Sequence, residues 1–255
     1  MRFLPLLLAT LFGAGGGIAA TLLLAPPAPP PSGSGSGTRI VDELVVQRIR
    51  IAEPDGSTVM VIGNSSSLPA SDDVDGAGPV REGIPGIIFF NPLGEEIGGL
   101  IYPARESEGG RFDGGVQLSM DQIDQTGQAI ALRHWRNGEF VRSMLEIVDY
   151  PTGIHSSEMN ADPEMKAIIE RIRGADSDAE RERLYKEVYL RRAGEKGYLA
   201  QRIFLGSEGA EDRSAKLVIK DSRSQPRIRL VVDENDVPRI ELLDAEGAVV
   251  RSVEP

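Results

Sequence analysis

The sequence predicts a mainly β protein whose antiparallel strands follow one another as a meander of short hairpins. Glycine and proline are frequent, with 29 and 17 of the 255 residues, so the chain turns often. Short runs of β-branched and aliphatic residues lie between those turns, and similar strand–turn units recur. The pattern fits an open sheet, a sandwich or an open barrel. One helical hairpin, at about residues 162–194, interrupts it.

Composition excludes several function classes. The formal net charge is −11, from 39 acidic and 28 basic residues, which argues against nucleic acid because phosphates attract clustered lysine and arginine. The chain has no cysteine, so disulfides, zinc–thiolate sites, iron–sulfur clusters and thiol catalysis are excluded. Aromatic residues make up only 5% of the chain, and the core is therefore expected to be mainly aliphatic.

The N-terminus is predicted to be a membrane segment. Residues 3–25 carry no charge and would span about 34 Å as a helix, enough to cross a bilayer core of about 30 Å. Arg2 favours a cytoplasmic N-terminus, which places the rest of the chain outside the cytoplasm, in the periplasm or at the cell surface. We expect a single-pass signal anchor at residues 1–25. The alternative is a cleaved signal peptide, which would release a secreted protein.

A linker separates this segment from the body of the protein. Residues 26–37 are first rich in proline, which favours a stiff polyproline II spacer, and then alternate serine with glycine. Such a tether predicts that residues 38–255 form a β-rich extracytoplasmic domain that folds independently of the anchor.

The first half of the domain predicts hairpins. The Arg48-Ile49-Arg50-Ile51 stretch alternates polar and apolar residues and precedes a Pro-Asp-Gly turn. Residues 86–102 form the most apolar hairpin, around the turn Asn91-Pro92-Leu93-Gly94. We expect its apolar side chains in the middle of the core, so aspartate at Ile88 or Phe89 should unfold the domain.

Further strands are predicted up to residue 153. A glycine-rich loop is expected through Gly115, followed by strands at residues 116–120, 129–135 and 140–148. The Asn137-Gly138 pair between the last two is the strongest two-residue hairpin signal in the chain. Residues 38–153 are therefore predicted to form a meander of about seven strands.

Two helices are predicted next. Asp162-Pro163 is a typical helix start, and Ser177 with Glu180 forms a capping box that begins the second helix. Gly194 ends the pair. The default interpretation is a helical hairpin packed on the sheet, and the alternative is a helix that binds a partner.

The C-terminal region contains repeated strands. The stretches Pro226-Arg227-Ile228-Arg229-Leu230 and Pro238-Arg239-Ile240-Glu241-Leu242 lie 12 residues apart, and an acidic turn follows each. These motifs resemble the Pro-Arg-Ile-x-Leu and Asp-x-x-Gly strand repeats of uncharacterised, N-terminally anchored bacterial proteins. The resemblance covers residues 215–253 and, more loosely, 44–102. It implies an anchored β protein and transfers no catalytic residue, because the motifs are structural.

Candidates for chemistry are few. His134 and His155 are not spaced as a zinc pair, and Asp121 with Asp124 could supply two carboxylates to a glycosidase only if the fold places them suitably. Residues 72–76 with Glu82 match part of a calcium loop at the wrong spacing. The aromatic residues that could stack on a sugar, but are expected in the core, are Phe89, Phe90, Tyr102 and Trp135. We assign no catalytic, cofactor-binding or metal-binding residue and expect no cofactor.

The sequence favours a membrane-tethered extracytoplasmic module of the cell envelope that binds or scaffolds an unknown ligand without catalysis. An exported hydrolase, acting on glycans through carboxylates on the β scaffold, is the alternative. The expected partners are the membrane, through the N-terminal helix, and either an envelope protein or further copies of the chain. Nucleic acid is not among them.

Overall fold

The computed structural model describes residues 40–70, 80–107, 110–123, 127–154, 156–210 and 214–254. The predicted anchor at residues 3–25 and the linker at residues 26–37 lie outside these ranges. Within them, no helix is both long enough and apolar enough to cross a membrane.

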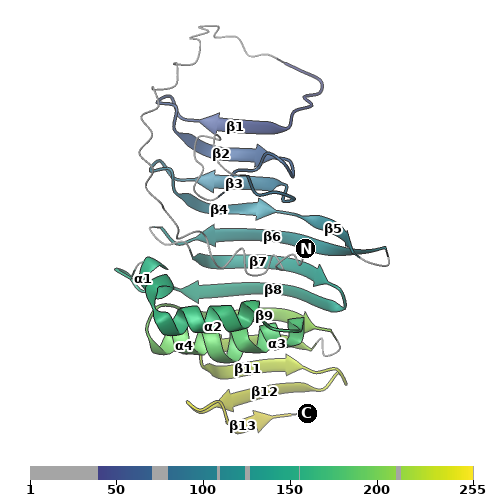
Figure 1. The fold of residues 1–255 in the computed structure, drawn as a ribbon. Helices are drawn as coiled ribbons and strands as arrows, with labels where there is room; N and C mark the ends of the chain where they lie inside the picture. Colours follow the sequence, from purple (N-terminus) through teal and green to yellow (C-terminus); the bar gives the residue numbers. More distant parts are fainter. Residues whose placement is uncertain are drawn as a thin grey trace.

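In the described part of the chain, thirteen strands form one open antiparallel sheet (Figure 1). The strands are β1 (Arg48–Ala52), β2 (Thr58–Gly63), β3 (Gly86–Phe90), β4 (Glu96–Ile101), β5 (Ala104–Ser107), β6 (Arg111–Asp121), β7 (Gln128–Asn137), β8 (Phe140–Asp149), β9 (Ala200–Gly209), β10 (Ala215–Lys220), β11 (Pro226–Val232), β12 (Pro238–Leu243) and β13 (Val249–Val253). Their order in space follows the chain, except that β4 pairs with β6 and β5 pairs only with β6. The predicted meander is confirmed, as an open sheet.

The prediction of a glycine-rich loop through Gly115 is wrong. β5 and the first half of β6 occupy that stretch, so eight strands rather than about seven precede the helices. The glycines belong to the strand because neighbouring backbones approach very closely there. A Cβ atom on Gly115 would lie 1.9 Å from the carbonyl oxygen of His134 on β7. Glycine in a strand interior often marks such a close approach.

Replacing Gly115 with alanine should therefore destabilise the sheet by about 2–3 kcal/mol, because the β6 and β7 backbones must separate to admit the methyl group. Thermal unfolding of Gly115→Ala measures the loss. The matched control is Gly174→Ala after the second helix, where the nearest atom to the new Cβ would be 3.4 Å away. Equal melting temperatures for the two variants would contradict the close approach.

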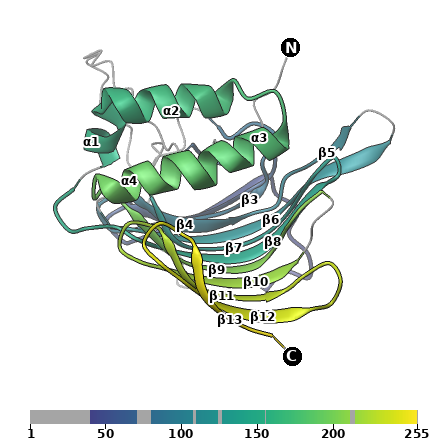
Figure 2. The same ribbon diagram turned by 90° about the horizontal axis from the view of Figure 1, so that it is seen from below.

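The helical insertion lies between β8 and β9. It comprises α1 (Ser156–Ala161), α2 (Pro163–Arg173), α3 (Asp178–Arg183), the π-helix η1 (Leu184–Leu190) and α4 (Arg191–Glu195). The Asp162 side chain accepts hydrogen bonds from the N–H groups of Glu164 and Met165, and Ser177 accepts one from Glu180, as the capping patterns predict. Figure 2 shows the two helical rods side by side on one face of the sheet.

Both main apolar cores lie on that same face, which we call the covered face. The larger core packs the helices onto the sheet, and its buried residues are Val148, Met159, Met165, Ile168, Ile169, Ile172, Leu184, Tyr189, Leu190, Ala193 and Leu199. The smaller core packs Leu68 and Ile84, from the connection between β2 and β3, onto the strands beside it. Its sheet residues are Val61, Ile88, Phe90 and Ile101.

Candidate functional site

The side of the sheet opposite the helices, which we call the open face, is apolar. Successive side chains of a strand point to opposite sides of the sheet. In β8, Met144, Glu146 and Val148 are buried on the covered face, so the residues between them, Leu145 and Ile147, lie on the open face.

The strand register places Leu145 in a continuous row of side chains that crosses the sheet. Leu145 pairs directly with Leu132 on β7 and with Leu205 on β9, and the pairing continues to both edges of the sheet. Each of the twelve strands other than β5 contributes one residue to this row. Each of these residues is isoleucine, leucine or valine. In spatial order the row is Ile49, Ile62, Ile87, Leu100, Leu118, Leu132, Leu145, Leu205, Leu217, Leu230, Ile240 and Val253.

A second row runs beside the first on the same face. It consists of Ile51, Met60, Phe89, Gly98, Met120, Ile130, Ile147, Ile203, Ile219, Ile228, Leu242 and Arg251. Ten of these twelve are apolar, and the exceptions are Gly98 and, at the edge strand, Arg251. We call the two rows together the aliphatic strip.

Much of the aliphatic strip is in contact with solvent. Leu132 is 55% exposed, and Leu205 and Ile240 are each 48% exposed, although each has strand neighbours on both sides. Monomeric proteins seldom expose contiguous apolar patches of this extent, and such patches commonly mark sites of interaction. The strip is therefore the candidate functional site.

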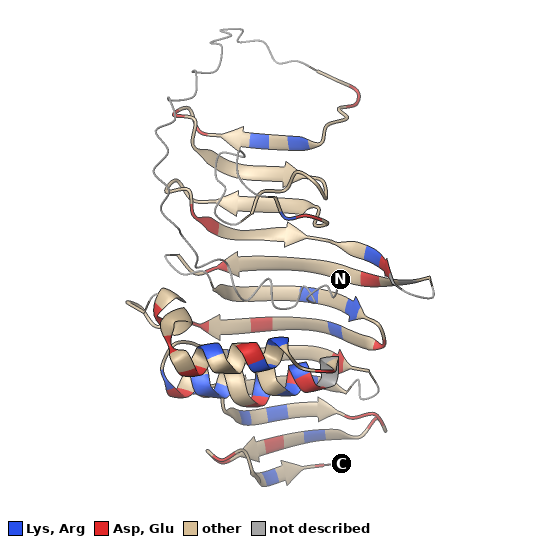
Figure 3. Ribbon diagram, in the orientation of Figure 1, with Lys and Arg blue, Asp and Glu red and all other residues tan. Residues whose placement is uncertain are grey.

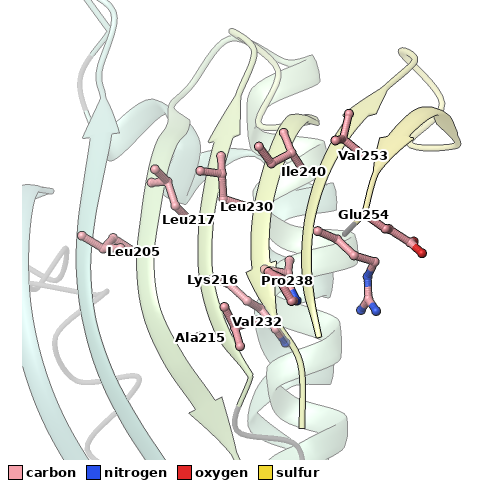
Figure 4. Close-up of a pocket in the computed structure, with 12 residues that line it drawn as sticks. Leu205, Ala215, Lys216, Leu217, Leu230, Val232, Pro238, Ile240, Val253 and Glu254 are labelled. Carbon is pink, nitrogen blue, oxygen red and sulfur yellow. The ribbon is translucent and has the colours of Figure 1, made fainter. Parts of the chain in front are cut away.

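A hollow of about 520 Å³ lies at the C-terminal end of the strip. Its apolar lining includes Leu205, Leu217, Leu230, Ile240 and Val253, which project from neighbouring strands while the helices lie behind the sheet (Figure 4). The charged residues that also line it are Lys216, Arg239 and Glu254. The hollow is thus part of the aliphatic strip with a partly polar border.

The covered face, in contrast, buries charges in compensated networks. Arg142 of β8 forms ion pairs with Glu182 of α3 and with Glu208 of β9, the latter at 3.0 Å. Lys186 of η1 lies 3.3 Å from Glu182 and also pairs with Glu208. Burial opposes ionisation of Glu182, but the charges of Arg142 and Lys186 outweigh it and lower the Glu182 pKa. This network attaches the helices to the sheet.

A second polar row crosses the sheet beneath the helices. Arg133 donates hydrogen bonds to Gln117 at 2.7 Å and to Glu146 at 2.9 Å. Gln201 links Glu146 to Lys220 on β10. Burial lowers the Lys220 pKa to about 8. Each of these groups has a partner, so the arrangement stabilises the sheet and presents no free acid, base or nucleophile.

Asp121 carries a carboxyl group on the covered face with a raised pKa. Burial and the neighbouring Glu96 raise its pKa to about 7, against the opposing effects of a Ser119 hydrogen bond and of Arg81 and Arg133. Its Oδ1 atom is buried and accepts no hydrogen bond within the described residues. Glu96 itself forms an ion pair with Arg81, and burial raises its pKa as well.

Asp121→Asn is expected to stabilise the protein at high pH only. Because the folded pKa of Asp121 lies above the usual value of 3.8, the folded state binds more protons than the unfolded chain between about pH 4 and pH 7. Wild-type stability should fall as pH rises through this window, and the amide removes that loss. Melting temperatures of both forms at pH 4 and pH 8 test this. Parallel pH profiles would contradict it.

The predicted catalytic candidates do not assemble into a site. His134 Nδ1 lies 2.8 Å from Ser143 Oγ across β7 and β8, on the open face. A catalytic triad needs a carboxylate on the other ring nitrogen, and no such bond is present among the described residues. Those residues also contain no group of three histidine or carboxylate side chains that could hold a metal ion.

The other candidates are dispersed. His155, Asp124 and residues 72–76 lie outside the described ranges, so the partial calcium loop and the Asp121–Asp124 pair stay untested. Phe89 lies on the aliphatic strip, whereas Phe90 is buried on the covered face. Tyr102 is exposed, and Trp135 lies on the covered face, so the four aromatic residues do not form a sugar-stacking surface.

Sequence reasoning missed the aliphatic strip, although a signal for it exists. The repeated Pro-Arg-Ile-x-Leu motifs place Ile228 with Leu230, and Ile240 with Leu242, on one face of β11 and β12. The same alternation occurs in almost every strand. Only the register shows that these residues align across the whole sheet.

The chain matches no model of a protein family. It also matches none of the curated proteins. The resemblance to anchored bacterial strand-repeat proteins therefore stays a prediction.

Proposed function

We propose that the chain is a binding or scaffolding module of the cell envelope, without catalysis, that acts through its aliphatic strip. Residues 1–25 would anchor it to the membrane, with the sheet on the extracytoplasmic side. The observation that carries this proposal is the pair of apolar rows across twelve strands, left open to solvent on the face opposite the helices.

The area of the strip supports a binding role. Twelve strands at about 4.8 Å spacing span roughly 55 Å, and two rows along the strands add a width of about 14 Å. The resulting area of about 750 Å² is close to the roughly 800 Å² that each partner contributes to a standard protein interface. Burial of apolar surface contributes about 25 cal/mol per Å², so covering the strip would stabilise a complex strongly.

Three buried carboxylates of the covered face do not favour the hydrolase alternative. Glu146, Glu182 and Glu208 are buried beneath the helices in ion pairs with Arg133, Arg142 and Lys186. Carboxylates compensated in this way have no access to a substrate on the open face.

An affinity pull-down tests the proposal. The bait is the tagged full-length chain, and the source is envelope material from cells that also express the untagged chain. Wild type and Leu93→Glu should recover the same partner, whereas Leu205→Glu should lose it. Leu93 is a suitable control because it is 79% exposed and lies in the β3–β4 turn, away from the strip.

Circular dichroism of both variants establishes that they remain folded. The proposal is wrong if Leu205→Glu retains the full set of partners, or if wild type recovers neither another protein nor the untagged chain.

A further inference from the structure

We propose that the aliphatic strip binds a second copy of the same chain, so that two sheets pack face to face through their open faces. This inference rests on the proposed function, because it names the partner of the same surface. The shape, area and charge of the strip favour this occupant.

Shape favours a second copy. Strands twist, so a partner that covers twelve strands must follow the same twist along about 55 Å. Two sheets of equal twist pack aligned, at about 30° to each other and about 10 Å apart. A second copy has the same number of strands and the same twist, and it presents the same two rows of side chains. A single acyl chain is too narrow to cover both rows.

Area also favours a second copy. Two strips of about 750 Å² would bury roughly 1,500 Å² in total, within the 1,200–2,000 Å² of stable interfaces. Association through the sheet edges, β1 and β13, would add strands but leave the strip exposed. Of these two modes of self-association, only face-to-face packing removes the apolar rows from water.

Charge permits this packing despite the net charge of −11 on each chain. The two rows contain one charged residue, Arg251, at the β13 edge. Figure 3 shows charged residues gathered on the helical insertion, which lies on the opposite face. Two copies joined through their open faces therefore keep most of their like charges apart.

Twofold symmetry makes a specific geometric prediction. Face-to-face packing of identical sheets requires a twofold axis in the plane of the interface. If the axis runs along the strip, perpendicular to the strands, every residue of the strip lies near the same residue of the second copy. If the axis runs across the strip, parallel to the strands, only the residues at the centre of the strip lie near the same residue of the second copy. Leu132 and Leu145 are central, because six strands lie on each side of the boundary between β7 and β8. Leu132 therefore lies close to Leu132 of the second copy in either arrangement, within about one strand or row spacing.

The absence of cysteine from the chain allows a direct test. The test uses the full-length protein in isolated membranes. Leu132→Cys gives the chain a single thiol. A short bismaleimide should then produce a species of twice the chain mass. Leu93→Cys, at the exposed β3–β4 turn, should remain monomeric under the same treatment. Adding Leu205→Glu to Leu132→Cys should abolish the cross-link.

The other outcomes overturn the proposal in different ways. If the Leu132→Cys thiol is protected from a water-soluble maleimide but does not cross-link, another protein or a lipid covers the strip. The second-copy proposal is then wrong and the proposed function stands. If the thiol is labelled as readily as that of Leu93→Cys and does not cross-link, both are wrong. Cross-linking that is equal at Leu93 and Leu132, or that persists with Leu205→Glu, shows random collision and also overturns the second copy.

Discussion

Replacing Ile88 with aspartate is expected to unfold the N-terminal part of the sheet, with a loss of more than about 4 kcal/mol in the free energy of unfolding. Ile88 is 1% exposed and lies in the smaller core with Val61, Leu68 and Ile101. An aspartate there would bury a carboxylate without a partner, which is among the most destabilising changes a core can suffer. Denaturant unfolding of Ile88→Asp measures the loss.

Phe89→Asp is the matched comparison for Ile88→Asp, because Phe89 is the next residue of β3 and its side chain points to the opposite face of the sheet. Its side chain lies on the aliphatic strip and is partly exposed, so a monomer should lose only about 1–2 kcal/mol. The sequence predicts equal effects at the two positions, whereas the structure separates them. Unfolding midpoints that match in the two variants would contradict the assignment of faces.

The second large effect is expected at Arg142. Its side chain is 3% exposed and pairs with both Glu182 and Glu208, so Arg142→Met would leave two buried carboxylates with Lys186 as their remaining partner. Removing one member of a buried ion network costs about 3–5 kcal/mol. The helices should detach first, because Glu182 and Lys186 belong to the insertion.

A double variant separates the loss of charge balance from the loss of packing. Glu208→Gln, added to Arg142→Met, should restore most of the stability, because Lys186 and Glu182, which lie 3.3 Å apart, then remain as a balanced pair. Arg229→Met is the control: its pair with Glu241 is 2.7 Å long but its side chain is 36% exposed, so the loss should stay below about 1 kcal/mol. If Arg142→Met lost no more than this control, the network would have no structural role.

Local signals predicted the strands and helices well. A hairpin turn joins β7 to β8 where the Asn137-Gly138 signal lies, although the turn residues are Gly138 and Glu139 and Asn137 ends β7. Asp162 caps α2 as predicted, because cap chemistry depends on residues that are close in sequence. The stretch around Gly114 and Gly115 was misjudged for a physical reason. A glycine in a loop cannot be told from a glycine at a close approach of two strands by sequence alone. Only the position of the β7 backbone shows that Gly115 is of the second kind.

The candidate site depended on information that no single stretch contains. Ile49 and Val253 are ends of one row, yet they are separated by most of the chain. Period-two alternation predicts that each strand has an apolar side, but the register decides whether those sides align. The ion-pair network of the covered face could not be predicted from the sequence for the same reason. Its members Arg142, Glu182 and Glu208 are far apart in sequence and form no motif.

The nearly sequential pairing of the strands has a consequence for how the protein folds and opens. Each strand bonds mainly to its neighbours along the chain, so stability is approximately a sum of local interfaces, as in repeat proteins. Opening should begin at the free edges, β1 and β13, and proceed inward. Amide hydrogens of β7, β8 and β9, which hold the longest ladders and carry the helices, should then exchange last.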